Sequence, residues 1–177
     1  MAQTVEALLL DSFRFRFRGI KKLGDLTLAQ MSQEDLEWRP NDECNSAAVI
    51  IQHVHGNMLS RWTDFLTTDG DKPWRKRDGE FTEPDVVSRD ALLALWEEGW
   101  ACTLAAIDAL EEADLTKEVQ IRGKSLGLVD AVLRQIAHYS LHVGQLITIG
   151  KERLGSDWKT MSVPRGESKA YTPGKRD

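Results

Sequence analysis

The fold is decided by a stretch in the last third of the chain, Ala-His-Tyr-Ser-Leu-His-Val-Gly-Gln at residues 137–145. It lies within a longer segment whose apolar residues recur every three or four positions, the spacing of an amphipathic helix. On such a helix His138 and His142 lie one turn apart on the same face. The chain has four histidines, and the other two, His53 and His55, lie in a second segment of this kind. We therefore interpret the rest of the chain around these two helices.

The composition is that of one ordinary globular domain. The chain has 177 residues, of which 41% are hydrophobic and 29% are charged. Its formal net charge of −5 disfavours a nucleic acid or an anionic membrane as a general partner. Cys44 and Cys102 lack the spacing of a disulfide framework or a thiolate metal site. Because there is neither a leader pattern nor an apolar run of the ~18–20 residues that span a membrane, we expect a cytoplasmic protein.

Four long segments have helical periodicity and define the expected architecture. They cover residues 5–31, 47–69, 89–110 and 126–153. Ser46 and Ser88 precede the second and third segments and are predicted N-caps. The pattern predicts an all-α fold, a four-helix bundle of residues 1–154, followed by an irregular polar tail over 155–177. The spacing is compatible with an up-down-up-down order of the helices and with a crossed one.

Three shorter stretches depart from this pattern. Phenylalanine and arginine alternate over residues 13–18, a pattern that alone would predict a strand or a basic-aromatic nucleic-acid patch. The helical spacing on both sides and the acidic net charge of the chain favour a packed helix instead. Residues 70–84 form a long crossover, a kind of loop that is often functional, although we favour a simple connector. Val119 and Ile121 alternate with polar residues before Gly123, which predicts a short hairpin ahead of the last helix.

The histidine pair of the last helix is a candidate metal site. Two imidazoles four positions apart present two nitrogens on the same side, and neutral imidazole is a common ligand of zinc, nickel, iron and copper. One further ligand from the second helix would complete a site with an open position. His53 and His55 point about 200° apart around their helix, so only one of them can take part. Asn57 lies one turn after His53 and could orient it, which favours His53, while simple core packing is the alternative.

Several stretches carry a resemblance to a known family. They are Leu-Glu-Trp-Arg-Pro at residues 36–40, the histidine-containing run at 53–66, the segment Asp-Gly-Asp-Lys-Pro-Trp at 69–74, and residues 138–146. Together they resemble the DinB-like (YfiT-like) superfamily of metalloenzymes, in a branch of unknown function, over nearly the whole chain. The resemblance implies a four-helix bundle, a homodimer, and a divalent metal held by His53, His138 and His142. The expected metal is zinc or nickel, with iron or manganese as alternatives. His55 stands where that branch usually has a small residue.

The resemblance also implies an activity. Characterised members of the superfamily include bacillithiol S-transferases and a mycothiol-dependent isomerase. A metal ion with an open position can bind a thiol as the thiolate or lower the pKa of a bound water to ~7. We therefore expect a metal-dependent transferase that activates a low-molecular-weight thiol for attack on an electrophile, without nucleic-acid or membrane partners. The alternatives are a metal-binding stress-response bundle without turnover and a metal-dependent hydrolase.

Three further residues are candidates for supporting roles in such a site. Asn57 and Gln145 each lie one helical turn from an expected ligand and could hold it in place by a hydrogen bond. Arg134 lies one turn before His138 and could bind a substrate carboxylate. Packing on the helix surface is the alternative for the first two, and a solvated side chain is the alternative for the arginine.

Overall fold

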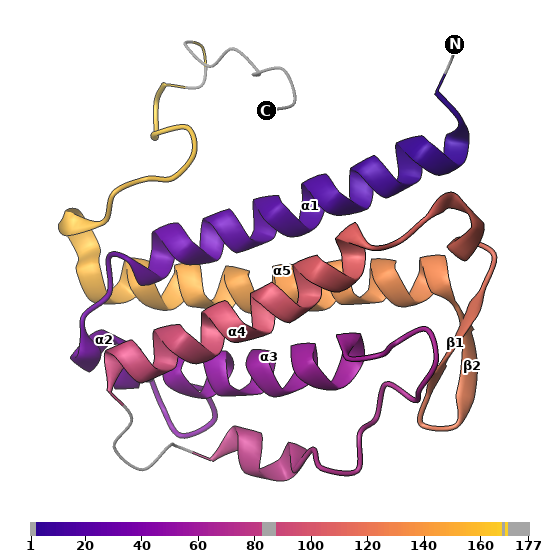
Figure 1. The fold of residues 1–177 in the computed structure, drawn as a ribbon. Helices are drawn as coiled ribbons and strands as arrows, with labels where there is room; N and C mark the ends of the chain where they lie inside the picture. Colours follow the sequence, from indigo (N-terminus) through magenta and orange to yellow (C-terminus); the bar gives the residue numbers. More distant parts are fainter. Residues whose placement is uncertain (1–2, 83–87, 168, 170–177) are drawn as a thin grey trace.

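The computed structural model describes residues 3–82, 88–167 and 169, and this part of the chain is mostly helical (Figure 1). The long helices are α1 (Val5–Leu28), α3 (Ala47–Trp62), α4 (Arg89–Asp108) and α5 (Leu128–Leu154). The short helical elements are α2 (Gln33–Glu37), η1 (Arg77–Phe81), η2 (Glu112–Asp114) and η3 (Gly155–Asp157). Strands β1 (Glu118–Ile121) and β2 (Lys124–Gly127) form an antiparallel hairpin in which Val119 lies opposite Leu126. Within the described residues, none of the helices has the length and apolar character needed to cross a membrane.

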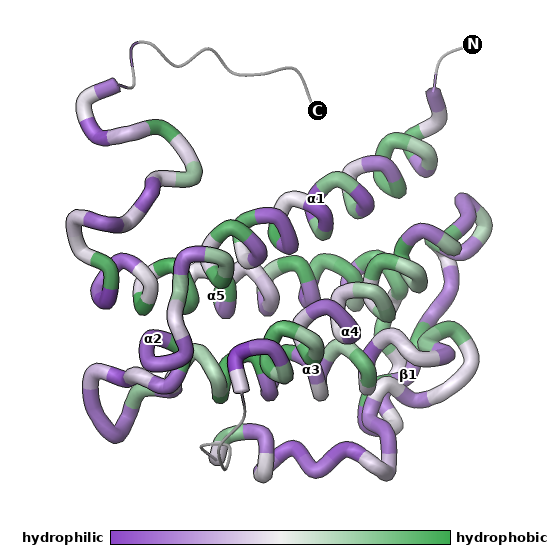
Figure 2. Tube along the Cα trace, turned by 60° about the vertical axis from the view of Figure 1, so that its left-hand side comes forward, coloured by the Kyte–Doolittle hydropathy of each residue, from purple (hydrophilic) through white to green (hydrophobic). Residues whose placement is uncertain are grey.

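The four long helices enclose one hydrophobic core. Helix α3 packs against α4 and α5, and α1 packs against the same two helices. Each long helix contains both apolar and polar residues (Figure 2). The spacing of the apolar ones lets the helix bury one face. Aromatic rings from all four helices meet in the centre, and burial of one such side chain stabilises the fold by about 1.5–3 kcal/mol. They include Phe17, Trp62, Trp100 and Tyr139.

The predicted helix ends are confirmed at three positions. The hydroxyl of Ser46 accepts a hydrogen bond from the amide of Val49, and the hydroxyl of Ser88 accepts one from the amide of Ala91. Each such cap contributes about 1 kcal/mol. At the C-terminal end of α5, Gly155 has a φ of 52°, a conformation that favours glycine, and the helix stops there. The predicted hairpin is also confirmed, and its turn contains Arg122 and Gly123 with φ angles of 56° and 68°.

The second predicted helix is too long. Helix α3 ends at Trp62 instead of continuing to residue 69. The backbone turns away at Asp64, whose φ is 49°, and the carbonyl oxygen of Asp64 accepts hydrogen bonds from the amides of Thr67 and Thr68. Phe65 and Leu66 still pack on the core, so the apolar spacing continued beyond the helix. The physical reason for the end is a turn that the hydrophobic pattern does not encode.

Helix α1 and the predicted tail differ in smaller ways. Helix α1 ends at Leu28 instead of residue 31, and four of its apolar residues are exposed, namely Val5, Leu8, Leu23 and Leu26. The beginning of the predicted tail runs back along this end of α1. There the amide of Lys159 donates a hydrogen bond to the Oε1 of Gln30 at 2.8 Å. Residues 83–84 of the predicted crossover and residues 168 and 170–177 of the predicted tail lie outside the described residues.

Candidate metal centre

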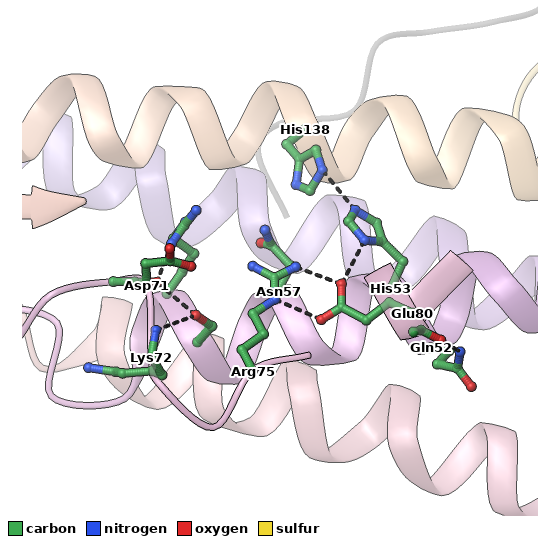
Figure 3. A network of polar contacts seen from close by, with 12 residues as sticks. Gln52, His53, Asn57, Asp71, Lys72, Arg75, Glu80 and His138 are labelled. Carbon is green, nitrogen blue, oxygen red and sulfur yellow. Dashed lines mark hydrogen bonds and ion pairs between the residues drawn. The ribbon is translucent and has the colours of Figure 1, made fainter. Parts of the chain in front are cut away.

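Three histidines from two helices converge between α3 and α5. The Nε2 of His138 lies 3.3 Å from the Nε2 of His53 and 3.0 Å from the Nε2 of His142. Figure 3 shows His53 and His138 facing each other across the gap between their helices. Nitrogens bound to one zinc ion at 2.0–2.1 Å and tetrahedral angles lie about 3.3 Å apart. The three histidines could therefore bind one metal ion.

Hydrogen bonds behind two of the rings fix which nitrogens face the cluster. Nδ1 of His53 lies 3.0 Å from the Oε2 of Glu80, and Nδ1 of His142 lies 2.8 Å from the Oε1 of Gln145. An ionised carboxylate and an amide oxygen only accept hydrogen bonds, so both Nδ1 atoms carry the proton. In the neutral rings, the Nε2 lone pairs of His53 and His142 then point into the cluster, which is the tautomer that binds a metal ion.

His138 lies between these two lone pairs and cannot satisfy both. A neutral imidazole carries one proton, so its Nε2 can donate to only one of the neighbouring nitrogens. Its Nδ1 is buried and has no hydrogen-bond partner among the described residues. A cation that accepts the lone pairs of all three nitrogens would remove this mismatch. The donor set thus fits a divalent metal better than it fits a hydrogen-bonded core.

The charge state of the rings also suits a metal. Burial, together with the neighbouring His142 and His53, lowers the pKa of His138 to about 3. Burial likewise lowers the pKa of His142, against the opposing effect of its hydrogen bond with Gln145. Both imidazoles are therefore neutral at pH 7, and a neutral ring is the form that coordinates metal ions.

Glu80, which orients His53, is itself held by Arg75. The Nε and Nη2 of Arg75 donate to the two carboxylate oxygens of Glu80, both at 2.7 Å (Figure 3). Burial raises the pKa of this carboxyl, but hydrogen bonds from Arg75 and His53 outweigh burial and bring the pKa below its ordinary value. Glu80 is therefore ionised, and the chain Arg75–Glu80–His53 fixes the orientation of one candidate ligand.

Glu80 and Arg75 are not among the site residues that the sequence predicts. Both lie in the crossover between α3 and α4, which has no hydrophobic period and is typical of a simple connector. One indication was present in α3, where Gly56 interrupts a good helix pattern one turn after His53. A Cβ at this position would overlap the Oε1 of Glu80 and lie 2.9 Å from its Cδ. The glycine leaves the space that the carboxylate occupies.

The remaining predicted residues lie in different places around the cluster. Gln145 contacts His142 as described above. The hydrogen bond of Asn57 goes to Tyr139 instead of His53: its Oδ1 accepts from the hydroxyl of Tyr139 at 3.0 Å, and that buried hydroxyl accepts in turn from Trp62. The role expected of Asn57 is taken by Glu80. His55 points to α4, where its Nε2 lies 2.9 Å from the Oε2 of Glu98.

A cavity of about 160 Å³ adjoins the cluster. His53 and His138 form part of its wall, beside Asn57 and Gln135. Five arginines complete the wall, and they come from α3, the crossover, the hairpin turn and α5. They are Arg61, Arg75, Arg77, Arg122 and Arg134. The candidate Arg134 thus lies where it can reach a ligand bound next to the histidines.

Fold and site together define a mostly helical protein with a candidate three-histidine metal centre. The chain belongs to the family described as "Protein of unknown function (DUF1572)", whose model matches residues 4–167. The match includes all three histidines of the cluster. A comparison with curated proteins gave no match, and a comparison with solved structures gave none either.

Proposed function

We propose that this protein is a metal-dependent enzyme of the DinB-like four-helix-bundle type, and that it transfers a low-molecular-weight thiol to an electrophile. The observation that carries the proposal is the convergence of three Nε2 atoms, two of them with their Nδ1 protons fixed by Glu80 and Gln145. The assignment to the DinB-like superfamily rests on the resemblance of the sequence stretches quoted above. Zinc or nickel is the expected metal because the three donors are all imidazoles.

His53, His138 and His142 would hold the metal. A divalent cation bound there would favour the anionic form of a thiol or a water at its remaining position. The protein's own residues contribute orientation: Glu80 keeps the ring of His53 in one tautomer, and Gln145 does the same for His142. The cavity beside His53 and His138 gives a substrate access to the cluster.

A catalytic role is favoured over a purely structural one by the number of ligands. Structural zinc sites normally have four protein ligands, whereas catalytic sites have three and an open position. Within the described residues the cluster consists of three histidines. A metal-dependent hydrolase remains the second candidate, because the same arrangement would serve an attacking water.

The test is a conjugation assay with the purified, metal-loaded protein. Bacillithiol, glutathione, mycothiol and cysteine are each offered with a chromogenic electrophile, and ester hydrolysis is followed without any thiol. We expect conjugation with at least one thiol, loss of it in His138→Ala, and its retention in His55→Ala, since His55 contacts Glu98 instead of the cluster. Conjugation that is equal in both variants, or activity only in the thiol-free ester assay, would overturn the transferase proposal.

A further inference from the structure

The wall of the cavity beside the histidines is unusually basic. Among the described residues that line it, all five charged side chains other than histidine are arginines, and none is an aspartate or a glutamate. The chain as a whole is acidic, with 28 acidic residues against 23 lysines and arginines. The arginines come from four separate elements that the fold brings together. A concentration of positive charge that runs against the net charge indicates a site for an anion.

The cavity has more arginines than nearby carboxylates. Arg75 is paired with Glu80, and Arg122 is paired with Asp71 at 3.1 Å. Arg61 donates to the backbone carbonyl of Gly70, which carries no charge. Among the described residues, Arg77 and Arg134 have no carboxylate within ion-pair distance. Within the described part of the chain, the cavity wall therefore has more guanidinium groups than carboxylates paired with them.

The arginines also influence one another. Burial lowers the pKa of Arg61, and the charges of Arg75 and Arg134 lower it further, against the opposing effect of Asp71. Such mutual repulsion is relieved when an anion binds between the guanidinium groups.

We propose that the substrate that enters this cavity is a small dianion, whose carboxylate or phosphate oxygens are bound by Arg77 and Arg134 while the reacting group lies at the histidines. A guanidinium group presents two parallel N–H donors, which match the oxygens of a carboxylate or phosphate. The cavity is smaller than the ~300–1,000 Å³ of sites for drug-sized ligands, so a small ligand or the acidic part of a larger one fits. The place of the reacting group at the histidines rests on the proposed function.

The test is isothermal calorimetry of the protein as purified, at constant ionic strength, with malate, inorganic phosphate, acetate and glycerol as probes. We expect a dianion to bind more tightly than acetate, and glycerol not to bind. If malate binds more tightly than phosphate, the substrate class is a dicarboxylate. If phosphate binds more tightly than malate, the substrate class is a phosphate. Arg77→Gln and Arg134→Gln should each weaken dianion binding about 10- to 100-fold, the range for a lost charged hydrogen bond.

Matched variants separate this inference from general charge effects. Arg16→Gln removes the same charge from an exposed position on α1 and should leave binding unchanged. Arg134→Lys keeps the charge but lacks the paired donors, so it should restore part of the affinity. Dianion affinities that are the same in wild type, Arg77→Gln and Arg134→Gln would overturn the inference.

Metal analysis of the same samples distinguishes the two proposals. If Arg134→Gln keeps its metal and loses the dianion, the result supports both the metal centre and the anion site. If the protein holds no metal but the dianion still binds through these arginines, the proposed function fails and the anion site remains.

Discussion

Glu80 accepts a hydrogen bond from the Nδ1 of His53 at 3.0 Å, although the two residues lie 27 positions apart in the chain. The contact joins the crossover to α3 and sets the direction of the His53 lone pair. It makes the crossover part of the site, because the loop supplies the group that orients one of the three candidate ligands.

Replacement of Glu80 by glutamine tests this relationship. The amide removes the negative charge that Arg75 and His53 share, so we expect metal affinity to fall about 10- to 100-fold. The free energy of unfolding should also fall by roughly 1–3 kcal/mol, because the buried Arg75 loses its charged partner. Competition with a coloured chelator measures the metal affinity, and urea denaturation measures the free energy of unfolding.

Glu98→Gln is the control, since Glu98 is exposed and pairs with His55, which lies outside the cluster. Equal metal affinity in Glu80→Gln and Glu98→Gln would show that Glu80 does not orient a metal ligand.

Gly56 offers an independent test that leaves the polar residues in place. In Gly56→Ala the new methyl group would occupy the position of the Glu80 carboxylate, which Arg75 and His53 hold in a buried site. We expect weaker metal binding and a loss of about 1–3 kcal/mol in stability from overpacking.

The matched control is Gly19→Ala in α1, where an added Cβ meets no atom within 4 Å. That substitution should stabilise the protein by up to about 1 kcal/mol, because alanine is the better helix former. Thermal unfolding of both variants gives the comparison. A Gly56→Ala variant that is as stable as Gly19→Ala and binds metal normally would show that neither stability nor metal binding depends on the observed position of Glu80.

The low pKa of His138 predicts how stability depends on pH in the chelator-treated protein. Burial and the neighbouring histidines lower this pKa from 6.5 to about 3 in the folded chain. Between these two values the unfolded chain takes up a proton that the folded chain does not. The contribution of His138 to the free energy of unfolding is therefore fully present above about pH 6.5 and is lost as the pH falls toward 3. We expect the free energy of unfolding to fall more steeply over this interval in wild type than in His138→Gln; parallel curves would show that His138 is not buried as described.

The long helices and the hairpin follow from periodicity and were predictable from the sequence, whereas the end of α3 and the contacts of the crossover were not. The spacing of His138 and His142 on a long apolar helix places both rings on one face without any tertiary information. The end of α3 at Trp62 depends on the backbone turn at Asp64, and the apolar Phe65 and Leu66 obscured it.

The candidate site shows the same division. The approach of His53 to the pair on α5 requires a choice between two histidines, and helix geometry alone left that choice open. Apart from Gly56, nothing in the sequence pattern pointed to Glu80 and Arg75, because their contacts are made by a crossover whose conformation follows from the packing of the completed fold. The five arginines of the cavity are likewise dispersed over the sequence and meet only in three dimensions.

Elemental analysis of the purified protein shows directly whether the three histidines hold a metal ion. We expect about one divalent metal ion per chain in wild type, since three ligands with an open position hold one ion. We expect that ion to be lost, with the helical circular dichroism retained, in His138→Ala, and the metal content to be normal in His55→Ala. Wild-type protein that binds no zinc, nickel, iron or manganese after incubation with each, or a His138→Ala variant that keeps its full metal content, would contradict the three-histidine metal centre.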